Sequence, residues 1–76
     1  MTRRKRLDEL CVGECATVDS LLCKGSVRRR FLDIGLVRGT KVICKGESPL
    51  GDPRAYLIRG ALIAVRGTDA HNVEIK

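Results

Sequence analysis

Glycine and proline divide the stretch from Ser26 to Arg66 into short pieces, and this limits the chain to small elements. A short helix, a glycine turn, a strand, a loop with both prolines and a hairpin follow one another there. A chain of 76 residues buries only about 60% of the surface that its unfolded form exposes. We therefore expect one small domain with a thin core, and nothing in this stretch has the pattern of an active site.

The alternation of apolar and polar residues predicts a mainly β fold. A helix is expected from Val27 to Ile34, with Ser26 as its N-cap and Gly35 at its end. Helical turns are expected at Leu7–Leu10 and Thr68–His71. The predicted strands are Cys15–Leu22, Thr40–Lys45, Arg54–Arg59, Ala61–Arg66 and Val73–Lys76. About five short strands, with one short α-helix between the first two, predict a small β-barrel.

The positive charge of the chain is concentrated at its start. The net charge is +6, and the run Arg3–Arg6 supplies four of these charges, so +2 remains from Leu7 onward. We expect residues 1–6 to be a basic flexible tail and residues 7–76 to be the domain. No apolar run approaches the roughly 18 residues that cross a membrane, and no apolar signal core follows the basic start. A cytoplasmic protein is therefore expected.

Four cysteines leave three interpretations open. A secreted disulfide framework fits their even number but not the expected location. A zinc or iron site would favour paired C-x-x-C motifs, and this chain has only the wider pair Cys11 and Cys15, with Cys23 and Cys44 alone. Cys11, Cys15 and Cys23 are therefore weak candidate metal ligands. The third interpretation is that the thiols are reduced and act as small apolar residues.

Enzyme signatures are missing from the sequence. The single histidine, His71, has no second group at a spacing that would orient it as a base, and we interpret it as a solvated loop residue. No G-x-x-x-x-G-K-[ST] motif is present for nucleotide phosphates. We expect a protein that acts by binding, without catalysis.

A small basic barrel that binds nucleic acid is an alternative. The cluster Arg28, Arg29 and Arg30 supports it. Proteins that bind single strands interleave such groups with stacking aromatic residues, and the chain has only Phe31 and Tyr56. The arginines also fit a solvated helix face.

Three blocks in order resemble the FeoA family, the small proteins of the bacterial ferrous iron transport system. They are R-R-R-F-L-D-I-G-L-V-R-G-T-K-V, then P-L-G-D-P, then L-I-A-V-R-G-T-D-A. The lead-in L-C-V-G-E-C-A-T-V is similar to the family's opening. The chain departs from the family pattern at Arg38, Ser48 and Asp69, and neither the cysteines nor the Arg3–Arg6 tail belongs to that pattern.

The resemblance implies an SH3-like β-barrel that is an accessory or regulatory protein of ferrous iron uptake. It implies a partner, the membrane ferrous iron transporter with a GTPase domain, and binding of a transition metal ion such as iron or zinc. Such a partner would hold the protein at the inner face of the cell membrane. There the Arg3–Arg6 tail would meet anionic lipid, with about 1 kcal/mol for each cation near the surface.

The hairpin of Ala55–Val65 motivates a contact hypothesis, because apolar residues occupy both of its faces. One face closes the core, and the other is free for a partner. The expected partner-binding residues are Leu50, Leu57 and Leu62, with Arg28, Arg29 and Arg30 at the rim. Alternatively, the predicted helix covers that second face.

Overall fold

The computed structural model describes residues 5–76, and its elements alternate between short strands and single helical turns. The chain begins with β1 (Lys5–Arg6), the 3-10 turn η1 (Leu7–Glu9), β2 (Cys15–Leu21) and α1 (Gly25–Asp33). It continues with β3 (Lys41–Glu47), β4 (Arg54–Ile58), β5 (Ala61–Val65), α2 (Gly67–Ala70) and β6 (Val73–Ile75). Among the described residues, no helix has the length and apolar character needed to cross a bilayer.

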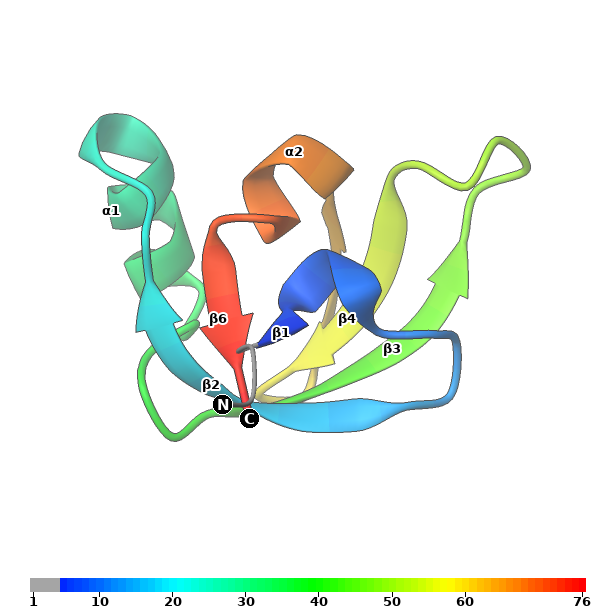
Figure 1. Ribbon diagram of the computed structural model, residues 1–76, viewed down its shortest axis with the longest axis horizontal. Coiled ribbons are helices and arrows are strands. Elements are labelled where there is room, and N and C mark those ends of the chain that lie inside the picture. Colours follow the sequence, from blue (N-terminus) through cyan, green and yellow to red (C-terminus); the bar gives the residue numbers. More distant parts are fainter. Residues whose placement is uncertain (1–4) are drawn as a thin grey trace.

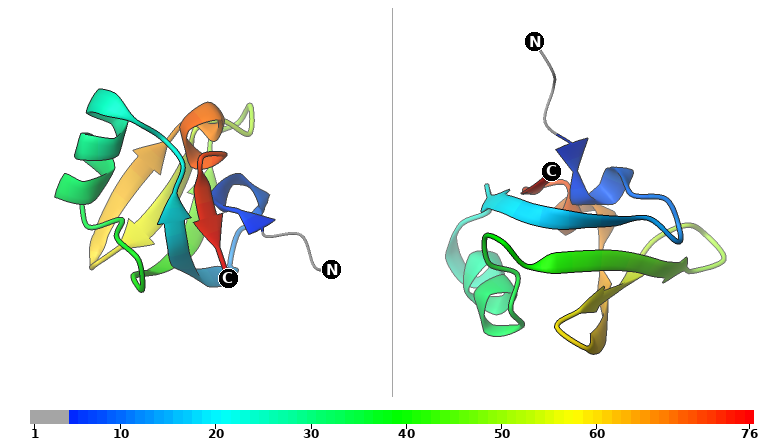
Figure 2. Two further views of the ribbon diagram at one scale, coloured as in Figure 1. Left: turned by 60° about the vertical axis from the view of Figure 1, so that its left-hand side comes forward. Right: turned by 90° about the horizontal axis from the view of Figure 1, so that it is seen from below.

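The strands form one antiparallel sheet in the order β1-β6-β2-β3-β4-β5. The sheet curls around its own inner face, with α1 at one side and α2 at one end (Figures 1 and 2). Strand β2 pairs with β3 along its first half and with β6 along its second, and the register shifts between Val18 and Ser20. This mainly β architecture confirms the predicted fold class.

The core lies inside the curled sheet, and every long element contributes to it. Its fully buried side chains include Phe31 of α1, Val42 of β3 and Ile58 of β4. Val27 and Ile34 of α1 pack against this cluster. Val27, Phe31 and Ile34 fall at i, i+4 and i+7, and this apolar stripe of the helix packs into the core.

Two differences from the expected elements concern the start of the domain and the start of the helix. Lys5 and Arg6 were expected in the flexible tail, but they form β1 and pair with Ile75 and Glu74 of β6. The sheet thus has six strands, and the main helix follows the second. Arg3 and Arg4 lie outside the described residues. Strand β1 depends on pairing with a segment that is distant in sequence, and the start of the helix depends on a single turn. Local sequence patterns reveal neither of these.

The helix N-cap was also misplaced. Lys24, not Ser26, precedes α1, and no side chain caps its first turn. Gly25 has a φ of +66°, so the chain turns into the helix before Ser26 is reached. The C-terminus follows the prediction, because Gly35 has a φ of +95° directly after the C-cap Ile34.

Strands β4 and β5 form the predicted hairpin through a two-residue turn at Arg59 and Gly60. Both residues have positive φ, 51° and 84°, as a type I′ turn requires. The loop Ser48–Pro53 is ordered by its own hydrogen bonds: Ser48 Oγ donates to the Asp52 carbonyl oxygen at 2.6 Å, and the Ser48 amide donates to that of Pro53 at 3.1 Å. This loop, which contains both prolines of the chain, is therefore held in shape.

Candidate functional site

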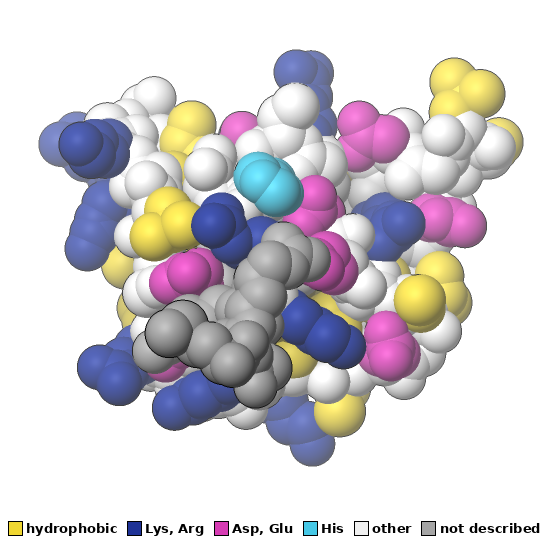
Figure 3. Space-filling model, viewed as in Figure 1, with side chains coloured by type: hydrophobic (Ala, Val, Ile, Leu, Met, Phe, Trp, Pro, Cys, Tyr) yellow, Lys and Arg dark blue, Asp and Glu magenta, His cyan; other side chains and the backbone are white. Residues whose placement is uncertain are grey.

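The expected partner-binding residues fall into three separate places. Leu57 of β4 and Leu62 of β5 stand directly opposite each other. Leu50 lies at the tip of the β3–β4 loop and is 94% exposed. Arg28–Arg30 lie on α1, on the other side of the molecule from that loop (Figures 1 and 3). The structure therefore joins Leu57 with Leu62 and separates Leu50 and the arginines from them.

The strand register extends the Leu57 and Leu62 pair into an apolar row across four strands. Cys15 pairs with Ile43, Ile43 with Leu57, and Leu57 with Leu62. Paired residues point to the same face of a sheet. We call these four residues the outer row: Cys15, Ile43, Leu57 and Leu62.

The outer row faces away from the core. Its strand neighbours Val42, Tyr56 and Ile58 are buried, so the row takes the opposite side of the pleat. Ile43 and Leu57 are half-buried, Cys15 is exposed, and Leu62 is 65% exposed. Because α1 packs its apolar stripe into the core, it leaves Leu62 uncovered. The alternative that the helix covers this second face does not fit this geometry.

Cations flank the outer row. Lys41 lies two residues before Ile43 on β3, and exposed Lys45 lies two residues after it. Lys41 also lines an open hollow of about 450 Å³ together with Arg38 and Arg59. Within residues 5–76, no ion pair engages Lys41, Lys45 or Arg59. This part of the surface therefore presents apolar side chains beside uncompensated positive charge.

The carboxylate of Glu14 lies at the Cys15 end of the row, and it accepts a hydrogen bond from the backbone. Glu14 Oε1 accepts the Cys11 amide N–H at 2.8 Å. That bond lowers the pKa of Glu14 below its ordinary value, so the group stays charged and occupied.

The arginines of α1 differ in their surroundings. Arg30 Nη2 lies 3.1 Å from Asp69 Oδ2 of α2, and its guanidinium carbon lies 5.6 Å from the centroid of the Phe31 ring. Arg28 and Arg29 are exposed. Arg30 thus links α1 to α2 while its side chain stays 59% exposed, and no such link holds Arg28 or Arg29 among the described residues.

The cysteines proposed as metal ligands are not brought together. Cys11 and Cys15 are exposed, whereas Cys23 and Cys44 are buried. Across residues 5–76, no three side chains of histidine, cysteine, aspartate or glutamate gather in a way that could hold a metal ion. Since a structural zinc site closes with four such ligands, the donor set found here does not fit one.

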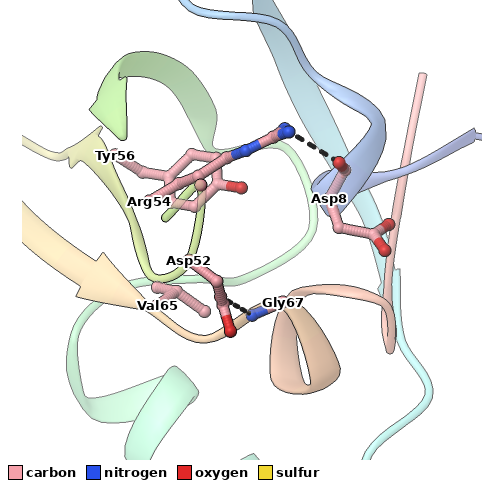
Figure 4. A pocket seen from close by; sticks show the side chains of 7 residues that line it. Asp8, Asp52, Arg54, Tyr56, Val65 and Gly67 are labelled. Carbon is pink, nitrogen blue, oxygen red and sulfur yellow. Dashed lines mark hydrogen bonds between the residues drawn. The ribbon is translucent and has the colours of Figure 1, made fainter. Parts of the chain in front are cut away.

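A second hollow, of about 190 Å³, lies between η1, the Ser48–Pro53 loop and α2, and Arg54 and Asp52 in its lining make hydrogen bonds within the fold (Figure 4). Arg54 Nη1 donates to the carbonyl oxygens of Asp8 at 2.9 Å and Leu10 at 2.6 Å. Asp52 Oδ1 accepts the Gly67 amide N–H at 2.6 Å. These bonds fasten the N-terminal turn and the loop to the sheet, so we interpret this hollow as structural.

His71 closes the same region at the surface. It is exposed, as expected, and its Nδ1 lies 3.2 Å from Asp8 Oδ2. The other oxygen, Asp8 Oδ1, is buried and has no hydrogen-bond partner. Arg6 Nη1 donates to the His71 carbonyl oxygen at 2.8 Å. The histidine therefore takes part in holding the N-terminal segment against α2.

Neither aromatic side chain of the protein is available for stacking on a base. Phe31 is 0% and Tyr56 is 1% exposed. Burial raises the pKa of Tyr56 to about 12, and its hydroxyl donates to the Leu7 carbonyl oxygen at 3.4 Å. The surface therefore lacks the stacking groups of a single-strand reader, which argues against the nucleic-acid alternative.

The chain matches a known protein family. The profile of the FeoA domain matches residues 5–76. The chain belongs to the FeoA domain family. A curated relative is the Fe(2+) transport protein A/Fe(2+) transporter FeoB fusion protein of Porphyromonas gingivalis, 32% identical over 71 residues. The match covers 93% of this chain and 8% of that protein, so the chain spans a small part of its relative.

Solved FeoA structures share the fold. The solution structure of FeoA from Chlorobium tepidum is 38% identical and superposes with a TM-score of 0.88, over 93% of this chain and 68% of that one. FeoA from Stenotrophomonas maltophilia, a prokaryotic SH3 domain protein complexed with zinc, is 25% identical with a TM-score of 0.84, over 95% and 89% of the two chains. The barrel is accordingly SH3-like, and the predicted family is confirmed.

Cys15 and Ile43 were not predicted as members of the outer row. The alternation on β2 and β3 assigns each residue to a face of the sheet, and this information was present in the sequence. The register that aligns them with Leu57 was not, because it depends on pairing between strands far apart in the chain.

Proposed function

We propose that this member of the FeoA domain family is an accessory and regulatory protein of ferrous iron uptake, which binds the cytoplasmic side of a GTPase-containing ferrous iron transporter. The observation that carries the proposal is the Porphyromonas gingivalis relative, in which transport protein A and the transporter FeoB are one chain. A fusion holds its two parts at high effective concentration, which favours their association.

The features of the surface support a binding role without catalysis. Arg54 and Asp52 at the Figure 4 hollow are bonded within the fold, whereas Lys41 and Lys45 beside the outer row have no ion-pair partner among the described residues. An apolar surface rimmed by charge is typical of a protein interface.

Loss and restoration of uptake tests this proposal. In cells of the source organism that lack this protein, uptake of radioactive ferrous iron should fall, and the wild-type protein should restore it. The transporter's abundance is measured in parallel, so that a change in uptake is not one of expression. Unchanged uptake at limiting ferrous iron would contradict an accessory role.

Contact of the basic N-terminus with the membrane is a second part of the proposal. Lys5 and Arg6 belong to β1, so their removal would disturb the fold, and the test is better made at Arg3 and Arg4. Arg3→Ser with Arg4→Ser should weaken binding to vesicles that contain phosphatidylserine, by about 2 kcal/mol at low salt. Equal vesicle binding of the wild type and the double variant at low salt would show that Arg3 and Arg4 do not contribute to membrane contact.

Transition-metal binding remains a prediction. In this chain the exposed pair Cys11 and Cys15 is the part of the predicted ligand set that solvent reaches. If they bind zinc or ferrous iron, one equivalent of metal should raise the melting temperature, and Cys11→Ser with Cys15→Ser should abolish that rise. A rise that persists in the double variant would exclude both thiols as ligands.

A further inference from the structure

The outer row crosses four strands on the outside of the curled sheet, and its length limits what can cover it. Neighbouring strands lie about 4.8 Å apart, so four residues in register across four strands span roughly 14 Å. The row runs across the strands, which places its length perpendicular to β3 and β4. An α-helix of three turns is about 16 Å long and carries one apolar stripe along its side.

The positive charges beside the row determine which charge a partner must carry. Lys41 lies about 7 Å from Ile43, the distance of two residues along a strand, and Lys45 follows Ile43 at the irregular pairing between Cys44 and Gly46. Arg59 extends the positive edge on the Lys41 side, where it shares a hollow with Arg38 and Lys41. A helix about 10 Å in diameter would bring its flanking positions over these cations.

A second copy of the chain is a poor occupant of this surface. Two outer rows placed face to face would bring Lys41, Lys45 and Arg59 of one copy against the same cations of the other, and the chain as a whole carries +6. Like charges in apposition oppose such a contact. A partner with acidic side chains along both edges of an apolar stripe removes this cost.

We infer that the outer row and its flanking cations form a docking site for an amphipathic helix of a partner protein, with leucine-like residues on its inner stripe and aspartate or glutamate along both edges. This deepens the proposed function and rests on it for the identity of the protein that carries the helix. Leu62, which is 65% exposed, would lose most of that exposure in the contact.

Cys15 makes the site accessible to direct measurement. It is an exposed thiol at one end of the row, and Cys11 is an exposed thiol outside the row. A helix that covers the row should slow alkylation of Cys15 by a maleimide while Cys11 reacts at its normal rate. Cys23 and Cys44 are buried and should react slowly in the folded protein throughout.

The probe is a synthetic 14-residue helical peptide with a leucine stripe flanked by glutamates, and its control has lysines in place of the glutamates. We expect the glutamate peptide to slow Cys15 alkylation at least about tenfold and the lysine peptide to leave it unchanged. Protection by both peptides alike would contradict the charge argument. Protection by neither, or protection only by anionic vesicles, would overturn the helix proposal.

Matched variants locate the contact. Leu62→Ser should weaken binding of the glutamate peptide about tenfold, and Leu50→Ser, at an exposed leucine outside the row, should leave it within about twofold. Equal effects of the two variants would contradict the proposed site. Far-ultraviolet circular dichroism verifies that both remain folded.

The same alkylation assay with the purified transporter separates this inference from the proposed function. A transporter that binds the chain without protecting Cys15 would refute this docking site and leave the proposed function intact. A glutamate peptide that protects Cys15, together with a transporter that does not bind, would refute the proposed partner while supporting the site. A protein that protects its own Cys15 by dimerising would overturn the inference in favour of self-association.

Discussion

At the scale of single residues, the fold divides its charged groups into those it uses and those it leaves at the surface. Arg54 donates to two carbonyl oxygens of the N-terminal segment, and Asp19 is 5% exposed. Lys41 and Lys45 have no such role in the described chain. Substitution of Arg54 or Asp19 should therefore change the stability of the fold, and substitution of Lys41 or Lys45 should change binding.

Asp19 gives a direct test of this division. Its Oδ1 lies 3.9 Å from Arg38 Nε and 3.8 Å from Lys76 Nζ, at the irregular pairing of β2. Asp19→Asn removes the charge but keeps the shape, and since both cations are exposed we expect a loss of about 1 kcal/mol. Urea unfolding measures it, with Asp33→Asn on the exposed side of α1 as the control. An unchanged midpoint would show that the pairs contribute nothing.

Tyr56 makes the stability of the protein dependent on alkaline pH. Burial raises its pKa from 10.0 to about 12, so the folded state favours the neutral phenol. This contribution is complete below pH 10 and is lost as the pH rises toward 12. Between these values, the unfolding free energy of the wild type should fall by about 2 kcal/mol more than that of Tyr56→Phe. Parallel pH profiles of the two proteins would contradict a buried phenol.

The sequence was informative about single residues where their role is local. Leu57 and Leu62 could be predicted as a pair because a hairpin is a local structure, and Gly35 because a helix end requires a left-handed residue. Leu50 was grouped with them only by its apolar character. Its true place, at the far end of β4, follows from the direction of the strand.

At the scale of elements, the periodic pattern predicted each strand from β2 onward within one or two residues. β1 was missed because two basic residues have no strand pattern of their own, and only their pairing with β6 makes them a strand. Contacts between the two ends of the chain cannot be predicted from local patterns in a single sequence.

The contribution of β1 can be measured by truncation. A chain that starts at Leu7 loses the β1–β6 pairing and the bonds from Arg6 to His71 and Glu9, compared with a chain that starts at Lys5. We expect a loss of about 1–2 kcal/mol and a melting temperature lower by roughly 5 °C or more. Calorimetry of the two chains decides this, and equal melting temperatures would mean that β1 is dispensable.

The junction of α1 with the hairpin turn provides another prediction. Gly35 has a φ of +95°, and a methyl group there would collide with Cδ of Arg59. Gly35→Ala should cost at least about 1–2 kcal/mol, from strain and from the displaced arginine. Gly46→Ala is the control, because nothing lies within 4 Å of the added carbon and its φ is ordinary. Thermal unfolding of both variants tests the claim, and equal costs would contradict it.

At the scale of the whole molecule, the protein is a small barrel with a filled core, and the outer row lies on the face of the sheet that points away from that core. The family and the fold could be predicted from the sequence, since three blocks in order identify them. The outer face could not, because it is assembled from four strands by their register.

The most direct test of the central claim is the binding of this protein to the purified ferrous iron transporter, in lipid nanodiscs, by a titration at physiological salt. We expect a saturable complex with a Kd of about 10 µM or tighter, weakened about tenfold by Leu62→Ser and unaffected by Leu50→Ser. The absence of any complex between the two wild-type proteins at about 100 µM would contradict it.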